Sequence, residues 1–118
     1  MLYDVGKIDA FYNGARGQMV AKLLREDLSN IWDPSKTASN LAVGFPFYFF
    51  PEDVICPVLM PVEIGGIAWA YNQEIYTAII DSKSWPLESD SIDCILISHA
   101  LEFIPDHYGF LMEAGRVL

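Results

Sequence analysis

The sequence predicts an α/β fold, in which apolar strands alternate with helices. Residues 92–97 form a nearly continuous apolar run between polar segments, as expected for a strand covered on both faces of a sheet. Residues 8–32 instead repeat apolar side chains at helical spacing. A second amphipathic pattern covers residues 105–118, directly after the apolar run. Helices before and after apolar strands indicate a layered α/β domain.

Residues 1–37 are predicted to form a helical segment. Gly14 and Gly17 weaken its middle, because glycine is a poor helix former. We therefore expect a short helix, a break, and a longer helix from about residue 16 to residue 32. Residues 33–36, Asp-Pro-Ser-Lys, stop that helix and form a loop. The apolar side chains of the segment are Ile8, Phe11, Tyr12, Ala15, Met19, Val20, Leu23, Leu24, Ile31 and Trp32.

Four apolar runs are predicted to be strands, over residues 41–45, 54–60, 75–80 and 92–97. Pro57 in the second run has no amide hydrogen to donate, so it must face a bulge or an unpaired edge. Pro105 suits the first position of the last helix, which is expected to run to residues 116–118. The apolar face of that helix comprises Phe110, Leu111, Ala114, Val117 and Leu118.

The composition is apolar for a chain of this size. A chain of 118 residues makes one domain at most. Apolar residues make up 53% of it, although small domains need proportionally more polar surface. The excess indicates either a surface that is buried against something else or a well-filled core. Cys56 and Cys94 lie in apolar runs and are expected to be free thiols.

Charge is unevenly distributed along the chain. Residues 1–37 carry five basic and five acidic side chains, whereas residues 38–118 carry two basic and eleven acidic ones, which accounts for the net charge of −9. Phosphate contacts need Lys and Arg, so nucleic-acid binding is not expected. His99 and His107 have no neighbours at metal-ligand spacing, so no metal site is expected.

Membrane insertion and secretion are not expected either. Residues 41–50 are very apolar but too few to span a bilayer, and Pro46 interrupts them. The N-terminus lacks a basic region followed by an apolar stretch, which is the pattern of a secretory signal. These features predict a cytoplasmic protein.

Short motifs in residues 81–118 point to a family. In order, they are Asp81, Trp85-Pro86-Leu87, Ser91-Ile92-Asp93, the apolar residues 94–97, Ser98-His99, Leu101-Glu102-Phe103 and Arg116-Val117-Leu118. Several of these spacings agree at once with the class I S-adenosylmethionine-dependent methyltransferases of the type 11 kind, which this part of the chain resembles. The resemblance extends more weakly back to about residue 40.

The resemblance implies a partial, doubly wound, Rossmann-like sheet with strand order 3-2-1-4 and N-terminal helices. Residues 1–37 would be the helical segment, which either closes over the cofactor site or simply packs on the sheet. Residues 38–118 would be the N-terminal half of the methyltransferase domain. Complete members of the family have seven strands, so a form truncated after the fourth strand and its helix is expected.

The resemblance also implies S-adenosylmethionine as cofactor, bound at the carboxyl ends of the strands. Only Gly44 remains of the family's Gly-x-Gly-x-Gly loop, so that loop is degenerate. Glu63 comes three residues later than the acid that grips the ribose in related folds. Asp81 and Ser82 either contact the adenine or form a turn. The expected cofactor-binding residues are Gly44, Phe45, Met60, Asp81, Ser82 and His99.

Two functions remain open. The chain is either a methyltransferase, or the cofactor-binding half of one, that acts on an unknown small-molecule or protein acceptor, or a degenerate methyltransferase fold that serves as a binding or dimerisation module. Methyl transfer depends on alignment more than on a dedicated acid or base, so no catalytic residue is assigned. His99 is either a proton acceptor near the site or a structural residue. A homo-oligomer formed through residues 92–97 or the last helix is expected.

Overall fold

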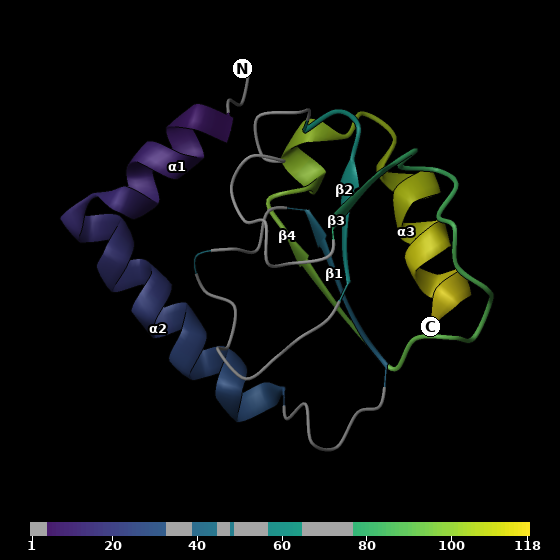
Figure 1. Ribbon diagram of the computed structural model, residues 1–118, viewed down its shortest axis with the longest axis horizontal. Coiled ribbons are helices and arrows are strands. Elements are labelled where there is room, and N and C mark those ends of the chain that lie inside the picture. The colour runs from purple at the N-terminus through teal and green to yellow at the C-terminus, as the bar shows by residue number, and fades with distance from the viewer. Residues whose placement is uncertain (1–4, 33–38, 45–47, 49–56, 65–76) are drawn as a thin grey trace.

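A parallel sheet lies between two N-terminal helices on one side and a C-terminal helix on the other (Figure 1). The computed structural model describes residues 5–32, 39–44, 48, 57–64 and 77–118. The elements are α1 (Val5–Asn13), α2 (Ala15–Ile31), β1 (Asn40–Gly44), β2 (Val58–Pro61), β3 (Thr77–Ile80), β4 (Cys94–Ser98), the 3-10 helix η2 (Leu101–Phe103) and α3 (His107–Val117).

The order of the strands is β3-β2-β1-β4, and all neighbours are parallel, which confirms the predicted partial Rossmann-like sheet. β1 pairs with β4 along its whole length, from Asn40 beside Cys94 to Gly44 beside Ser98. Parallel pairing brings the carboxyl ends of all four strands to one edge of the sheet, which we call the carboxyl edge. Gly44, Pro61, Ile80 and Ser98 end the strands there.

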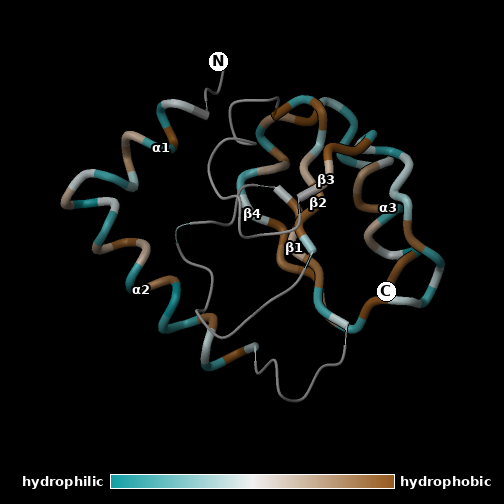
Figure 2. The backbone as a smooth tube through the Cα atoms, in the orientation of Figure 1, coloured by the Kyte–Doolittle hydropathy of each residue, from teal (hydrophilic) through white to brown (hydrophobic). Residues whose placement is uncertain are grey.

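The two faces of β1 bury different side chains, because successive residues of a strand point to opposite faces. Leu41 and Val43 belong to a large core cluster that includes α3. Ala42 belongs to a smaller cluster with Trp32, which follows α2. Figure 2 shows hydrophobic residues concentrated in the strands of this central sheet. The larger cluster comprises Leu41, Val43, Leu59, Met60, Ile64, Ile80, Trp85, Ala100, Ile104, Phe110, Ala114 and Val117.

The observed strands differ by a few residues from the predicted ones. β1 ends at Gly44, and residue 45 lies outside the described residues, as do residues 54–56 and 75–76 of the predicted second and third strands. Pro57 precedes β2, where its carbonyl accepts a hydrogen bond from the amide of Ala42 (3.1 Å). β4 begins at Cys94 rather than residue 92, because the amides of Ser91 and Ile92 bond the carbonyl of Val117 instead.

The predicted break in the N-terminal helices is present at Gly14, which caps α2. Gly17 also permits a close helix contact that the sequence analysis did not predict. A Cβ atom there would lie 1.8 Å from the backbone oxygen of Phe11, so the two helices approach each other more closely than a side chain permits. Glycine thus sets the angle between α1 and α2 as well as weakening the helix.

The start of α3 corrects one prediction. His107, not Pro105, is the first residue of the helix, and Asp106 is its N-cap. The carboxylate of Asp106 accepts a hydrogen bond from the amide of Gly109 (2.9 Å). A carboxylate in the N-cap position satisfies an amide that has no partner within the helix. Pro105 therefore lies one residue before the cap.

The end of α3 is bound to the loop that precedes β4. Glu113 accepts a hydrogen bond from the backbone amide of Trp85 (2.8 Å), and Arg116 donates one to the carbonyl of Trp85 (3.0 Å). The two side chains also bond each other, at 2.5 Å between Arg116 Nε and Glu113 Oε2. Trp85 is buried and packs edge-on against Phe110 at 5.2 Å between ring centroids. The ion pair thus fixes the loop while the indole fills the core.

Gly44 adopts a backbone conformation that other residues avoid. Its φ is 110°, and a Cβ atom there would lie 2.0 Å from the carbonyl oxygen of Ser98. β1 can therefore lie this close to β4 only with glycine at its last position.

We expect Gly44→Ala to destabilise the protein by about 1–3 kcal/mol, the cost of a strained backbone conformation. Gly115→Ala is the matched control, because nothing lies within 4 Å of a Cβ atom at that helical position. Alanine should stabilise that helix by about 0.5–1 kcal/mol. Urea unfolding followed by circular dichroism measures both, and equal effects in the two variants would contradict the close approach of β1 and β4.

We expect Glu113→Gln to remove a pH-dependent part of the stability. The hydrogen bonds from Arg116 and from the Trp85 amide lower the pKa of Glu113, so its contribution is complete above the unfolded pKa of about 4.3. That contribution is lost as pH falls through the lowered folded-state pKa. The stability difference between wild type and variant should therefore be largest near neutral pH and shrink on acidification. Thermal unfolding across this range, with Glu88→Gln as the control at an exposed carboxylate, is the measurement; parallel curves would refute the assignment.

Candidate functional site

The residues at or just after the ends of the four strands lie along the carboxyl edge of the sheet. Asp81 follows β3, Glu63 lies in the turn after β2, Gly44 ends β1 and His99 follows β4. Open α/β sheets bind their ligands at this edge, because the loops and helix ends there present free side chains and amides. The order of the strands places these residues in a row from Asp81 to His99.

Glu63 and Ser82 meet between the ends of β2 and β3. Ser82 is buried, and its hydroxyl donates a hydrogen bond to Glu63 Oε1 (2.9 Å). The hydroxyl of Ser82 is therefore already used within the protein. This contact brings the carboxylate of Glu63 to the end of β2, even though the residue comes late in the sequence.

Asp81 forms a turn. Its Oδ1 accepts a hydrogen bond from the amide of Lys83 (2.9 Å), and its backbone pairs with Ser84. The turn was one of the two roles expected for this residue. Because Asp81 is exposed, its carboxylate also faces solvent at the carboxyl edge.

His99 lies at the centre of a second polar group, formed with Tyr12 of α1 and Glu102 of η2. Its Nε2 lies 2.8 Å from the hydroxyl of Tyr12, and its Nδ1 lies 3.0 Å from Glu102 Oε2. The backbone of His99 has a φ of 50°, which is uncommon for a residue with a side chain. Burial and, to a lesser degree, the negative charge of Glu102 raise the pKa of the Tyr12 phenol.

Tyr12 is held by aromatic neighbours as well. It stacks on Tyr48 with ring centroids 4.6 Å apart and contacts Phe11 edge-on at 5.1 Å. The hydroxyl of Tyr48 donates a hydrogen bond to Asp9, and the carbonyl of Tyr48 accepts one from Arg25 (2.7 Å). Contacts from both N-terminal helices thus fix the ring beside the carboxyl edge.

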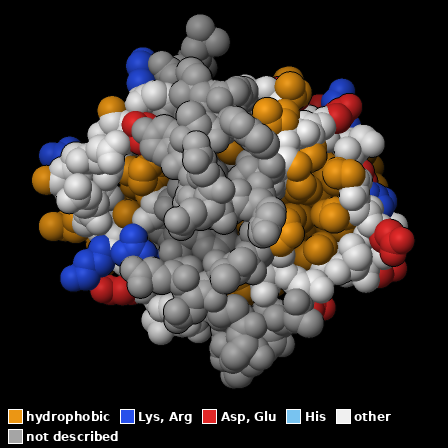
Figure 3. Space-filling view, viewed as in Figure 1, with side chains coloured by type: hydrophobic (Ala, Val, Ile, Leu, Met, Phe, Trp, Pro, Cys, Tyr) orange, Lys and Arg blue, Asp and Glu red, His pale blue; other side chains and the backbone are white. Residues whose placement is uncertain are grey.

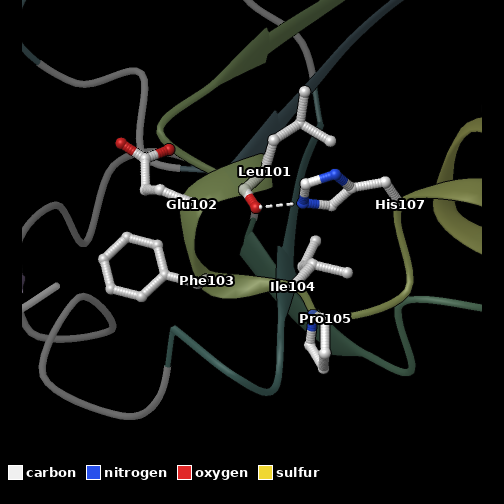
Figure 4. Close-up of a pocket in the computed structure, with 6 residues that line it drawn as sticks. All are labelled: Leu101, Glu102, Phe103, Ile104, Pro105 and His107. Carbon is white, nitrogen blue, oxygen red and sulfur yellow. Dashed lines mark hydrogen bonds between the residues drawn. The ribbon is translucent and has the colours of Figure 1, made fainter. Parts of the chain in front are cut away.

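An open groove of about 580 Å³ runs along η2 and the start of α3 (Figure 4). Glu102 and Phe103 extend to one side of η2, and His107 lies on the other side, where its Nε2 donates to the carbonyl of Leu101 (2.7 Å). The lining of the groove is mostly apolar and comprises Leu101, Glu102, Phe103, Ile104, Pro105 and His107.

The expected cofactor-binding residues do not all lie together. Gly44 and His99 are adjacent, because Gly44 pairs with Ser98, and Asp81 and Ser82 lie at the far end of the same edge. Met60 is fully buried in the core cluster, so its side chain is enclosed by other residues. Phe45 lies outside the described residues.

The sequence analysis missed two members of the group around His99. Tyr12 was placed only in an apolar helical stripe, and Glu102 only in a family motif. A signal for Tyr12 was available, because a buried tyrosine needs a partner for its hydroxyl. Nothing in the sequence could show that this partner is 87 residues away.

The described residues contain no group of three or more His, Cys, Asp or Glu side chains that could hold a metal ion. None of the helices in the described ranges is both long and apolar enough to cross a membrane. Cys94, half-buried in β4, carries a free thiol whose pKa is raised by burial and by Asp93.

Part of the chain matches a known protein family. The family described as methyltransferase domain matches residues 67–118, which contain β3, β4, η2 and α3. No curated protein and no solved structure matches the chain. The match covers the motifs from Asp81 to Leu118, and the sheet has the strand order that those motifs imply. The match therefore supports a class I S-adenosylmethionine-dependent methyltransferase-like domain over residues 67–118.

Proposed function

We propose that this chain binds S-adenosylmethionine at the carboxyl edge and takes part in methyl transfer to a small-molecule or protein acceptor. One observation carries the proposal: the parallel sheet with order β3-β2-β1-β4 places Asp81, Glu63, Gly44 and His99 in a row along one edge. The family match to residues 67–118 supports a methyltransferase-like function in general. The free thiol of Cys94 is compatible with a reducing, cytoplasmic compartment, which we include in the proposal.

The residues at this edge suit the groups of that ligand. S-adenosylmethionine supplies an activated methyl group on a sulfonium. Gly44 has no side chain, so the backbone of β1 can approach a ligand closely. The carboxylates of Glu63 and Asp81 can accept hydrogen bonds, as ribose hydroxyls and the adenine amine require. The order of these groups along the edge is that of the strands, with the carboxylates at β2 and β3 and His99 at β4.

Substitution of Asp81 tests the site. We expect Asp81→Ala to weaken S-adenosylmethionine binding by about 1–3 kcal/mol, the usual cost of leaving a polar group without its partner. Asp81→Asn separates the two roles of the residue, because its side-chain oxygen can still accept from the amide of Lys83 and keep the turn. Titration calorimetry of wild type and both variants is the measurement, with Glu88→Gln as the control. Unchanged affinity in Asp81→Ala would remove Asp81 from the site.

A second candidate function rests on β4. This strand pairs with β1 on one side, and within the described residues no strand pairs with its other side. Cys94 to Ile97 are only half-buried, whereas the residues of β1 after Asn40 are buried. Hydrophobic side chains also gather on the side of the molecule where α3 lies (Figure 3), and Leu111 and Met112 of that helix are about half exposed. An unpaired strand invites another strand to pair with it.

If the chain is a pairing module, two copies should join through β4 or through α3. Such an interface should bury more than about 1,000 Å², and the dimer should dissociate as the protein is diluted. Sedimentation at micromolar concentrations measures this, and calorimetry with S-adenosylmethionine distinguishes the two functions. A monomer at every concentration would exclude the pairing module, and absence of cofactor binding by the wild type would favour it.

A further inference from the structure

The group formed by Tyr12, His99 and Glu102 connects three separate parts of the chain by hydrogen bonds. Tyr12 belongs to α1, His99 follows β4, and Glu102 lies in η2. Both ring nitrogens of His99 are used, with Tyr12 Oη at 2.8 Å and Glu102 Oε2 at 3.0 Å. A carboxylate, an imidazole and a hydroxyl in this order form the arrangement by which proteins withdraw a proton from a hydroxyl.

The direction of the hydrogen bonds follows from the chemistry of the three groups. A carboxylate can only accept, so Nδ1 of His99 carries the proton that bonds Glu102. In the neutral ring Nε2 is then an acceptor, and the hydroxyl of Tyr12 donates to it. A phenol with an ordinary pKa is already protonated at neutral pH, and the raised pKa of Tyr12 favours this donating form further.

The surroundings hold these groups in place. The left-handed backbone of His99 costs free energy, and such conformations concentrate at functional sites. His99 directly follows Ser98, which pairs with Gly44 at the end of β1. Tyr12 is 6% exposed, and its ring is stacked on Tyr48. Two carboxylates bond to this group: Glu102 accepts from His99, and Asp9 accepts from the hydroxyl of Tyr48.

We propose that Tyr12, His99 and Glu102 form a proton relay for a methyl acceptor that attacks through a hydroxyl or an amine and must lose a proton from that group. This inference rests on the proposed methyltransferase function and names the class of acceptor. Tyr12 is the member that meets the acceptor, His99 receives the proton, and Glu102 is a positioning residue that acts through His99.

The proton and electron changes balance. The acceptor gives its proton to the oxygen of Tyr12, while the proton of the Tyr12 hydroxyl moves to Nε2 of His99. The electron pair left on the acceptor forms the new bond to the methyl carbon, and the electrons of the broken carbon–sulfur bond stay on sulfur. His99 is then an imidazolium stabilised by Glu102, and it returns the proton to water after product release.

The tautomer of His99 tests the relay without any cofactor. The chain has only two histidines, so nitrogen-15 NMR with His107→Gln for assignment resolves both. We expect His99 to carry its proton on Nδ1 by at least about tenfold over Nε2, and His107 to show the opposite form, because its Nε2 donates to the carbonyl of Leu101. Glu102→Gln should reduce the preference at His99 and leave His107 unchanged. An Nε2-protonated His99 in the wild type would overturn the relay.

A second experiment separates failure of the relay from failure of the proposed function. Tyr12→Phe keeps the stacked ring and removes only the hydroxyl, and Tyr108→Phe is the control at a tyrosine that is 75% exposed. Calorimetry should show S-adenosylmethionine affinity within about twofold of wild type in both variants. Transfer from labelled S-adenosylmethionine to a phenol or a primary amine should fall about 10²–10⁴-fold in Tyr12→Phe only.

Each result of that experiment has one meaning. Loss of transfer with retained binding supports the relay, and equal transfer by Tyr12→Phe and wild type overturns it. Transfer to a thioether probe alone, or to none of the probes, would overturn the proposed class of acceptor. A wild type that does not bind S-adenosylmethionine refutes the proposed function itself, whatever the tautomer of His99.

Discussion

The carboxyl edge depends on how closely β1 lies to β4 at their last pair of residues. Gly44 takes a φ of 110° there, and a side chain at this position would meet the carbonyl of Ser98. The strand next to it then turns sharply at His99, which is itself in a left-handed conformation. Two uncommon backbone conformations therefore lie side by side at this edge, because Gly44 pairs with the residue that precedes His99. The imidazole of His99 owes its position, beside α1 and η2, to this geometry.

Two of the family motifs quoted from the sequence, those that contain Trp85 and Arg116, are in contact through the packing of α3. Trp85 begins the loop before β4, and Arg116 lies near the end of α3, yet the two are joined through Glu113. The aromatic ring contributes apolar burial, while the ion pair satisfies the amide and the carbonyl of a backbone segment that enters the core. The buried ring needs the ion pair, because burying Trp85 would otherwise leave its backbone amide and carbonyl without partners, which costs free energy. These motif residues are therefore structural, and they hold β4 where its end can present His99.

The N-terminal helices contribute to the site as well as to the fold. Their apolar side chains cover one face of the sheet through Tyr12, Ala21 and Trp32. The close approach of α1 and α2 at Gly17 orients α1 so that Tyr12 reaches the end of β4. The sequence analysis left open whether this segment packs on the sheet or closes over the site, and the described contacts show that it packs on the sheet and reaches the carboxyl edge.

The sequence by itself determined the fold class, the order of the elements and the end of the sheet at which polar residues gather. Apolar runs, helical spacing and family motifs carry that information because each is local in the chain. It could not determine that Glu63 reaches Ser82, that Asp106 is the N-cap of α3, or that Tyr12 and Glu102 meet at His99. Those contacts depend on the register of parallel strands and on the angle between helices. Only the packed tertiary structure decided them, because it brings residues separated by up to 87 positions within hydrogen-bonding distance.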